Sequence, residues 1–217
     1  PGDKVLAFET GHFATLWKEV ANKLGIEVQW VEGDWRHGVD PEKTEQVLKG
    51  DSEHKIKAVL AVHTETSTGV TSRIDKIRQA IDAAGHPALF FVDAVSSLAC
   101  TEYLHDEWKV DVTVSGSQKG LMLPPGLSFN AVSEKALAAS KQSNSHHSYW
   151  CWDAMLSFNA KGYYPYTPNT NLMYGLEEAL FLLHEEGLAN VFSRHHRFAE
   201  ATRCAVSAWG LENVCLN

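Results

Sequence analysis

The sequence predicts an α/β fold in which a mostly parallel sheet carries helices on both faces. Short apolar segments alternate with amphipathic segments along most of the chain. The apolar segments are continuous rather than alternating in polarity, as expected for strands that are buried on both faces. Capping residues and glycines mark the boundaries between segments. The chain has 217 residues, which is enough for one or two domains with a sizeable core.

The first part of the chain alternates strictly between strand and helix. The second segment is an amphipathic helix, with Leu16, Val20 and Leu24 spaced at i, i+4 and i+8. The fourth segment opens with Asp40 as a helix cap and Pro41 at the first helical position. We expect a strand at 4–8, a helix at 12–24, a strand at 27–31, a helix at 41–48, a strand at 56–63 and a helix at 73–84.

The later part of the chain first continues this alternation and then departs from it. We expect strands at 88–93, 110–115 and 127–132, followed by a helix at 134–140 that Ser133 caps. From 143 to 171 the sequence is aromatic and irregular, which is typical of a functional loop or an interface. Two helices should follow, at 172–184 and 188–209, with Gly187 between them.

Polar side chains collect where the predicted strands end. His63, Asp93 and Ser115 each follow or close an apolar strand, and Lys119 lies in the small polar turn at 115–120. Open parallel sheets bind ligands beyond the carboxyl ends of their strands. A lysine that can form a Schiff base, and a carboxylate placed to hold a pyridinium nitrogen, are what pyridoxal phosphate (PLP) requires of a protein. The sequence therefore predicts a PLP site at this edge of the sheet.

Composition excludes other classes of function. The net charge of −8 argues against nucleic-acid binding, and no apolar run approaches the roughly 18 residues of a membrane helix. The four cysteines show no metal-binding spacing, which indicates a reduced intracellular protein, cytoplasmic or, in a eukaryote, alternatively peroxisomal. The adjacent pairs His146–His147 and His195–His196 are poor chelates because neighbouring side chains diverge, so we expect no metal site.

Six segments together resemble one protein family. They are Glu-Thr-Ser-Thr-Gly-Val (65–70), Val-Asp-Ala-Val-Ser-Ser-Leu (92–98), Asp-Glu-Trp-Lys-Val-Asp-Val (106–112), Ser-Gly-Ser-Gln-Lys-Gly (115–120), Leu-Pro-Pro-Gly (123–126) and Tyr-Pro-Tyr-Thr-Pro (164–168). In this order and spacing they resemble the class V aminotransferases of PLP fold type I, and most of all the serine–glyoxylate and alanine–glyoxylate aminotransferases. The resemblance covers essentially the whole chain.

The resemblance implies a role for four residues of the predicted site. Lys119 matches the lysine that forms the Schiff base with PLP and then moves a proton, which requires an amine that burial keeps neutral for part of the cycle. Asp93 matches the carboxylate that pairs with the pyridinium nitrogen. Thr66 matches a residue that hydrogen-bonds the cofactor near its phenolic oxygen, although a local turn is an alternative role. Gln118, more than the neighbouring serines, matches a phosphate contact.

Three further residues complete the implied site. Phe13 matches the aromatic residue that stacks on the pyridine ring. If the match is shifted by one residue, His12 takes this role instead. Alternatively, Phe13 has no cofactor role and simply packs in the core. Tyr164 and Thr167 match positions that reach the phosphate of the neighbouring subunit. The resemblance therefore implies a homodimer with a shared active site, and the alternative for these two residues is a packed aromatic loop.

The resemblance also implies the extent and activity of the protein. We expect residues 1–186 to form the PLP-binding large domain and residues 187–217 to begin the small domain, with the fold truncated at both ends. The implied substrates are amino acids and 2-oxo acids. The implied reaction moves the amino group of L-serine to glyoxylate by a ping-pong mechanism. The alternatives are alanine as the donor, a class V lyase such as a cysteine desulfurase, and a non-catalytic remnant of the same fold.

Overall fold

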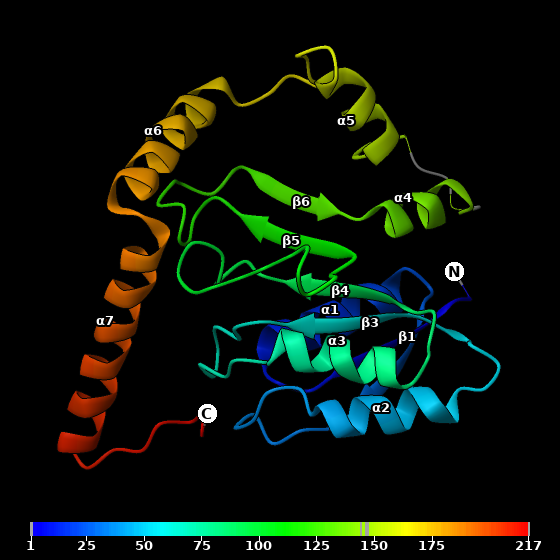
Figure 1. The fold of residues 1–217 in the computed structure, drawn as a ribbon, viewed down its shortest axis with the longest axis horizontal. Coiled ribbons are helices and arrows are strands. Elements are labelled where there is room, and N and C mark those ends of the chain that lie inside the picture. Colours follow the sequence, from blue (N-terminus) through cyan, green and yellow to red (C-terminus); the bar gives the residue numbers. More distant parts are fainter. Residues whose placement is uncertain (1, 144, 146–147, 217) are drawn as a thin grey trace.

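The computed structural model describes residues 2–143, 145 and 148–216 (Figure 1). Within them the strands are β1 (Lys4–Phe8), β2 (Glu27–Val31), β3 (Ile56–Val62), β4 (Leu89–Asp93), β5 (Val112–Gly116) and β6 (Ser128–Val132). The helices are α1 (His12–Lys23), α2 (Pro41–Gly50), α3 (Ile74–Ala83), α4 (Glu134–Lys141), α5 (Trp152–Asn159), α6 (Thr170–Glu186) and α7 (Leu188–Ala208).

The strands form one sheet in the order β2-β1-β3-β4-β5-β6. The first five strands are mutually parallel, and β6 joins the edge antiparallel to β5. The prediction of a mostly parallel sheet is confirmed. Because β1 to β5 run the same way, their carboxyl ends meet at one edge of the sheet, on the side of α6 and α7 in Figure 1.

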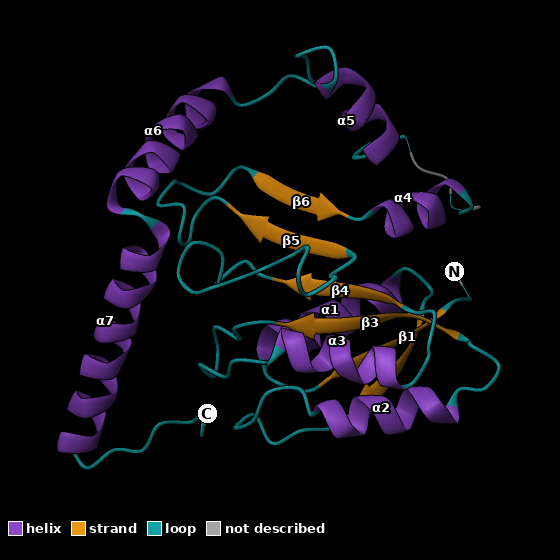
Figure 2. Ribbon diagram, in the orientation of Figure 1, coloured by secondary structure: helices purple, strands orange, loops and turns teal. Residues whose placement is uncertain are grey.

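Helices cover both faces of the sheet (Figure 2). On one face, α1 packs against β1 and β3 through Ala21 and Trp17. On the other face, α2 and α3 pack through Leu48, Ile77 and Ile81, which join the larger apolar cluster of the strands. This second face holds most of the fully buried side chains, so the main core lies between the sheet and these two helices.

Helix α1 does not turn its longest apolar stripe inward. Leu16, Val20 and Leu24 are 36%, 56% and 60% exposed, whereas Ala14 and Ala21 are buried against the sheet. An amphipathic helix normally buries its apolar stripe. Here the small alanine side chains let the helix lie close to the strands, and the larger aliphatic residues lie on its outer side.

The aromatic stretch at 143–171 is more regular than its sequence suggests. Helix α5 forms in its middle, where we expected irregular chain. Its cap residue, Cys151, makes no side-chain capping hydrogen bond, so the helix lacks the usual start signal. The pair His146–His147 lies outside the described residues, so the expectation that it binds no metal stays a prediction.

Helices α6 and α7 run along the carboxyl edge of the sheet (Figure 1). Gly187 separates them with a φ of 81°, a left-handed conformation that favours glycine. Leu183 and Val191, on either side of this break, pack with Ala99 and Leu121 from the turns after β4 and β5. Gly187 lies at the predicted domain boundary, which stays a prediction. None of the described helices is long and apolar enough to cross a membrane.

Candidate active site

Three of the predicted site residues lie at or just beyond the carboxyl ends of neighbouring strands. Asp93 is the last residue of β4, Thr66 lies in the turn after β3, and Lys119 lies in the turn after β5. These strands are adjacent and parallel. The three turns are therefore neighbours at the edge where open α/β sheets bind ligands.

Asp93 is a buried carboxylate, only 8% exposed. Its Oδ2 accepts a hydrogen bond from Nε1 of Trp17 at 3.1 Å, and its Oδ1 accepts one from the backbone N–H of Val95 at 2.9 Å. Burial raises the pKa of Asp93, and the charge of Glu65 adds to the rise, while both hydrogen bonds and the Lys119 ammonium oppose it. Each carboxylate oxygen can accept a second hydrogen bond, so the group can hold a cationic N–H.

The turn that carries Lys119 has a fixed backbone. Ser117 is fully buried, and its hydroxyl donates to the carbonyl oxygen of Pro124 at 2.8 Å. A Cβ on Gly120 would lie 2.2 Å from the carbonyl oxygen of Leu98, so only glycine fits there. Lys119 itself is exposed. The described residues therefore hold the backbone at this lysine but do not supply the burial that the family resemblance implies.

The polar residues around Lys119 divide into two kinds. The hydroxyls of Ser115 and Ser117 are engaged with the backbone, and Ser115 donates to the carbonyl oxygen of Ala94 at 3.3 Å. Gln118 is exposed, and a Cβ on Gly116 would meet its Oε1 at 2.8 Å. Of these residues, Gln118 stays the predicted phosphate contact.

Thr66 is linked to the turn after β4 rather than to its own turn. Its Oγ1 lies 2.5 Å from Oγ of Ser96, and either hydroxyl can be the donor. Thr68 instead takes the local role, because its hydroxyl accepts from the backbone N–H of Val70 at 3.3 Å. When two hydroxyls share one hydrogen bond, one hydroxyl hydrogen remains to be donated to another group.

Phe13 lies in the first turn of α1 and is 37% exposed. His12 contacts it edge-on, with the ring centroids 5.5 Å apart. Trp17 follows one helical turn later, which places it next to Phe13 on the helix surface. Helix α1 thus brings an aromatic residue and the indole donor of Asp93 to the same end of the sheet.

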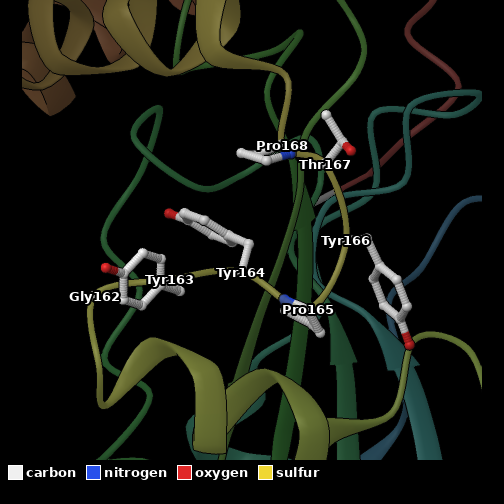
Figure 3. Close-up of a pocket in the computed structure, with 7 residues that line it drawn as sticks. All are labelled: Gly162, Tyr163, Tyr164, Pro165, Tyr166, Thr167 and Pro168. Atoms are coloured by element: carbon white, nitrogen blue, oxygen red, sulfur yellow. The ribbon is translucent and has the colours of Figure 1, made fainter.

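Tyr164 and Thr167 lie elsewhere. They belong to the segment between α5 and α6, which lies beyond the β6 side of the sheet, away from β3 and β4 (Figure 1). Residues 162–168 line an open hollow, with the rings of Tyr163 and Tyr164 on one side of the chain and Tyr166 on the other (Figure 3). Tyr164 is 42% exposed. The end of this segment lies beside the turn between β5 and β6, because a Cβ on Gly126 would lie 3.8 Å from Nδ2 of Asn169.

Comparison with known proteins decides the family. The model of the aminotransferase class-V family matches residues 1–214. The chain belongs to the class V aminotransferases.

Relatives and solved structures agree with this assignment. The serine–glyoxylate aminotransferase of Methylorubrum extorquens is 52% identical over 216 residues, which cover 97% of this chain and 54% of that protein. The L-aspartate–glyoxylate aminotransferase of Paracoccus denitrificans is 46% identical over 212 residues, covering 98% of this chain and 54% of that protein. The crystal structure of an alanine–glyoxylate aminotransferase from Nostoc sp. matches with a TM-score of 0.88 at 30% identity, over 98% of this chain and 56% of that one. The chain spans about half the length of the curated relatives it matches.

Class V aminotransferases in general use PLP, and the geometry of this member fits that cofactor. The buried Asp93 carboxylate suits a protonated ring nitrogen, and the Thr66–Ser96 hydroxyl pair retains a hydrogen for an oxygen acceptor. The amine of Lys119 is accessible for covalent chemistry, and Phe13 is exposed enough to contact a flat ring.

The remaining candidate groups lie outside that arrangement. His63 packs against Tyr103 and Trp108, at ring distances of 5.4 and 5.9 Å, next to the larger apolar cluster. Burial lowers the pKa of His63 to about 4, so the ring is neutral at pH 7. Among the described residues, no group of three or more His, Cys, Asp or Glu side chains could hold a metal ion.

Sequence reasoning missed three residues of the site. Trp17 could have been found, because it lies four positions after Phe13 on a predicted helix. Ser96 stands three positions after Asp93, in a segment that the resemblance had already singled out. The contacts of Glu65 join residues more than 50 positions apart, and no local pattern signals them.

Proposed function

We propose that the protein is a PLP-dependent aminotransferase that moves the amino group of L-serine to glyoxylate and yields hydroxypyruvate and glycine. The observation that carries this proposal is the 52% identity to a serine–glyoxylate aminotransferase over nearly the whole chain. The adjacent positions of Lys119 and Asp93 beyond β5 and β4 support it.

Lys119 and Asp93 would divide the proton chemistry between them. PLP bound here would supply an electron sink for the carbanion that forms at the substrate Cα. Lys119, accessible in the turn after β5, would be the base that takes a proton from this Cα and the acid that gives the proton back. The buried carboxylate of Asp93 would hold a proton on the pyridine nitrogen, because the positive charge relieves the cost of burying the anion.

Three other residues would hold the cofactor in place. Thr66 would donate the hydroxyl hydrogen left over from its pair with Ser96 to the phenolic oxygen. Gln118, exposed beside Lys119, would contact the phosphate. Phe13 would cover one face of the pyridine ring, since a flat apolar side chain packs well on a flat ring.

The protein would work as a homodimer with shared active sites. Tyr164 and Thr167 are exposed, so both side chains are accessible to a partner subunit, as expected of residues that reach the phosphate in that subunit. Residues 1–186 would form the large domain and residues 187–217 would begin the small one, with Gly187 at the break. Sedimentation of the protein and a Tyr164→Phe variant with weakened PLP binding would test this arrangement.

Steady-state kinetics test the reaction. For the protein expressed from its complete reading frame, double-reciprocal plots at several glyoxylate concentrations should be parallel. The reason is that the 2-oxo acid formed from the amino donor leaves before glyoxylate binds. Intersecting lines would count against the mechanism. L-serine should give a higher kcat/KM than L-alanine or L-aspartate. A preference for L-alanine would identify alanine rather than serine as the amino donor. If the folded protein showed no turnover although it contains Lys119, the non-catalytic alternative would be favoured.

Thiol chemistry of the cysteine desulfurase kind has little support from the structure. Cys100 lies near Lys119, but burial raises the pKa of its thiol, with Arg194 and Lys119 opposing the rise. A catalytic cysteine needs a depressed pKa and an accessible sulfur. Release of sulfide from L-cysteine would be the result that revives this alternative.

A further inference from the structure

Glu65 is a fully buried carboxylate in the turn after β3. Its Oε1 accepts hydrogen bonds from the backbone N–H of Phe13 at 3.2 Å, from the backbone N–H of Ser67 at 3.2 Å and from the hydroxyl of Ser67 at 2.8 Å. Its Oε2 accepts one from the backbone N–H of Ala14 at 3.1 Å. Four donors thus converge on one side chain, and both of its oxygens are engaged.

These contacts replace a local cap at the start of α1. The cap position is Gly11, which has no side chain to accept from the first turn. The backbone N–H of His12 donates instead to Oγ of Ser67 at 2.9 Å, so the first N–H groups of the helix are all held from the turn after β3. A Cβ on Gly11 would lie 2.4 Å from Cγ of Glu65, so the glycine allows this close approach. A negative charge at a helix N-terminus is also favoured by the helix dipole.

The helix held in this way carries two groups of the proposed site. Phe13 lies in its first turn, and Trp17, one turn later, donates to Asp93. We propose that Glu65 is a positioning residue, whose carboxylate fixes the first turn of α1 so that Phe13 and Trp17 keep their orientation at the cofactor site. The role of Glu65 at the cofactor site rests on the proposed function. Its role in holding α1 does not, because it follows from the hydrogen bonds alone.

The alternative is that Glu65 is a helix cap with no bearing on the site. Helix α2 offers a matched control, because Asp40 accepts from the backbone N–H of Glu42 at 2.8 Å and of Lys43 at 3.3 Å. This cap lies with α2 on the opposite face of the sheet from α1. Glu65→Gln keeps the shape of the side chain but turns an N–H₂ group toward a backbone donor. Asp40→Ala removes a cap of ordinary strength.

The first measurement is amide hydrogen exchange in the cofactor-free protein, expressed from its complete reading frame. In Glu65→Gln, exchange over residues 12–17 should speed up by about tenfold or more, because hydrogen bonds to a charged acceptor are lost. In Asp40→Ala, exchange should rise around 41–44 and not over 12–17. Unchanged exchange over 12–17 in Glu65→Gln would overturn the proposal.

The second measurement is PLP binding. It gives the dissociation constant of PLP and the visible circular dichroism per bound cofactor. Glu65→Gln should weaken binding by about tenfold or more and change the dichroism, while Asp40→Ala should leave both as in the unaltered protein. If Glu65→Gln bound PLP like the unaltered protein, Glu65 would be only a cap and the proposal would be wrong.

The design separates this inference from the proposed function. If the unaltered protein did not bind PLP, the proposed function would be wrong. The amide hydrogen exchange would still decide whether Glu65 holds the first turn of α1. If Glu65→Gln does not fold, Ser67→Ala is the milder variant, since it removes the acceptor for His12 and one of the donors to Glu65. Ser67→Ala should then show the same two effects at smaller size, and their absence would overturn the proposal.

Discussion

Replacing Trp17 with Phe should destabilise the protein in a pH-dependent way. The change keeps an aromatic ring beside the sheet but removes the indole N–H that donates to Oδ2 of Asp93 at 3.1 Å. A hydrogen bond to a charged group contributes about 1.5–3 kcal/mol, and one between neutral groups about 0.5–1.5 kcal/mol. The loss should therefore be larger when Asp93 is ionised than when it is protonated.

The sign of the pH dependence follows from the raised pKa of Asp93. Because burial raises this pKa in the folded state, ionisation of Asp93 lowers the stability as the pH rises through that pKa. The indole N–H opposes the rise, so Trp17→Phe should raise the pKa further. The extra cost of the variant should be small on the acid side and grow toward neutral pH.

Urea denaturation of the cofactor-free protein at several pH values measures this effect. The matched control is Trp30→Phe, because Trp30 packs in the same apolar cluster but holds Lys18 over its ring, 4.4 Å from the centroid, rather than a carboxylate. The free energy of unfolding should fall more with rising pH in Trp17→Phe than in Trp30→Phe. A pH-independent difference between the two variants would refute the reasoning.

Three further predictions concern the turn after β5 and the thiols. Lys119→Ala should abolish turnover and covalent PLP attachment without changing the fold, as measured by kinetics, mass spectrometry and circular dichroism; retained turnover would contradict the role. Gly120→Ala should lower the free energy of unfolding by about 1–3 kcal/mol and kcat by roughly 100-fold, because its Cβ would meet the carbonyl oxygen of Leu98 at 2.2 Å and displace the turn; wild-type stability and kcat would contradict the clash. Cys100, whose pKa burial raises, should react with iodoacetamide at pH 7.5 more slowly than the exposed Cys204, as peptide mapping would show, and equal rates would contradict it.

The framework of the fold was predictable from the sequence because its strands are continuous apolar segments. β1 and β2 have the predicted bounds, β3, β4 and β6 differ by one residue at one end, and β5 starts two residues later and ends one residue later than predicted. Helix α5 was missed because Trp152–Asn159 has no capping signal and lies among aromatic residues and prolines. The outward stripe of α1 was missed because the periodicity of a helix does not say which of two apolar faces meets the sheet.

The candidate site was predictable in part, for a similar reason. Asp93, Thr66 and Lys119 follow strands, and the topology of a parallel sheet brings strand ends together. The contacts that hold these residues join distant parts of the chain, as in the bond from Trp17 to Asp93 and the contacts of Glu65 with α1. Such pairs depend on the packing of α1 against the sheet, which local sequence does not encode.

The visible absorption spectrum of the protein from its complete reading frame, with PLP added, tests the central claim most directly. The account predicts a band of lysine-bound PLP that disappears when L-serine is added, as the cofactor takes up the amino group, and that Lys119→Ala fails to form. A folded protein that forms no such band with PLP would contradict the assignment of Lys119 and Asp93 to a PLP site. A band that does not change with L-serine but disappears with L-alanine would support PLP as the cofactor and contradict L-serine as the amino donor.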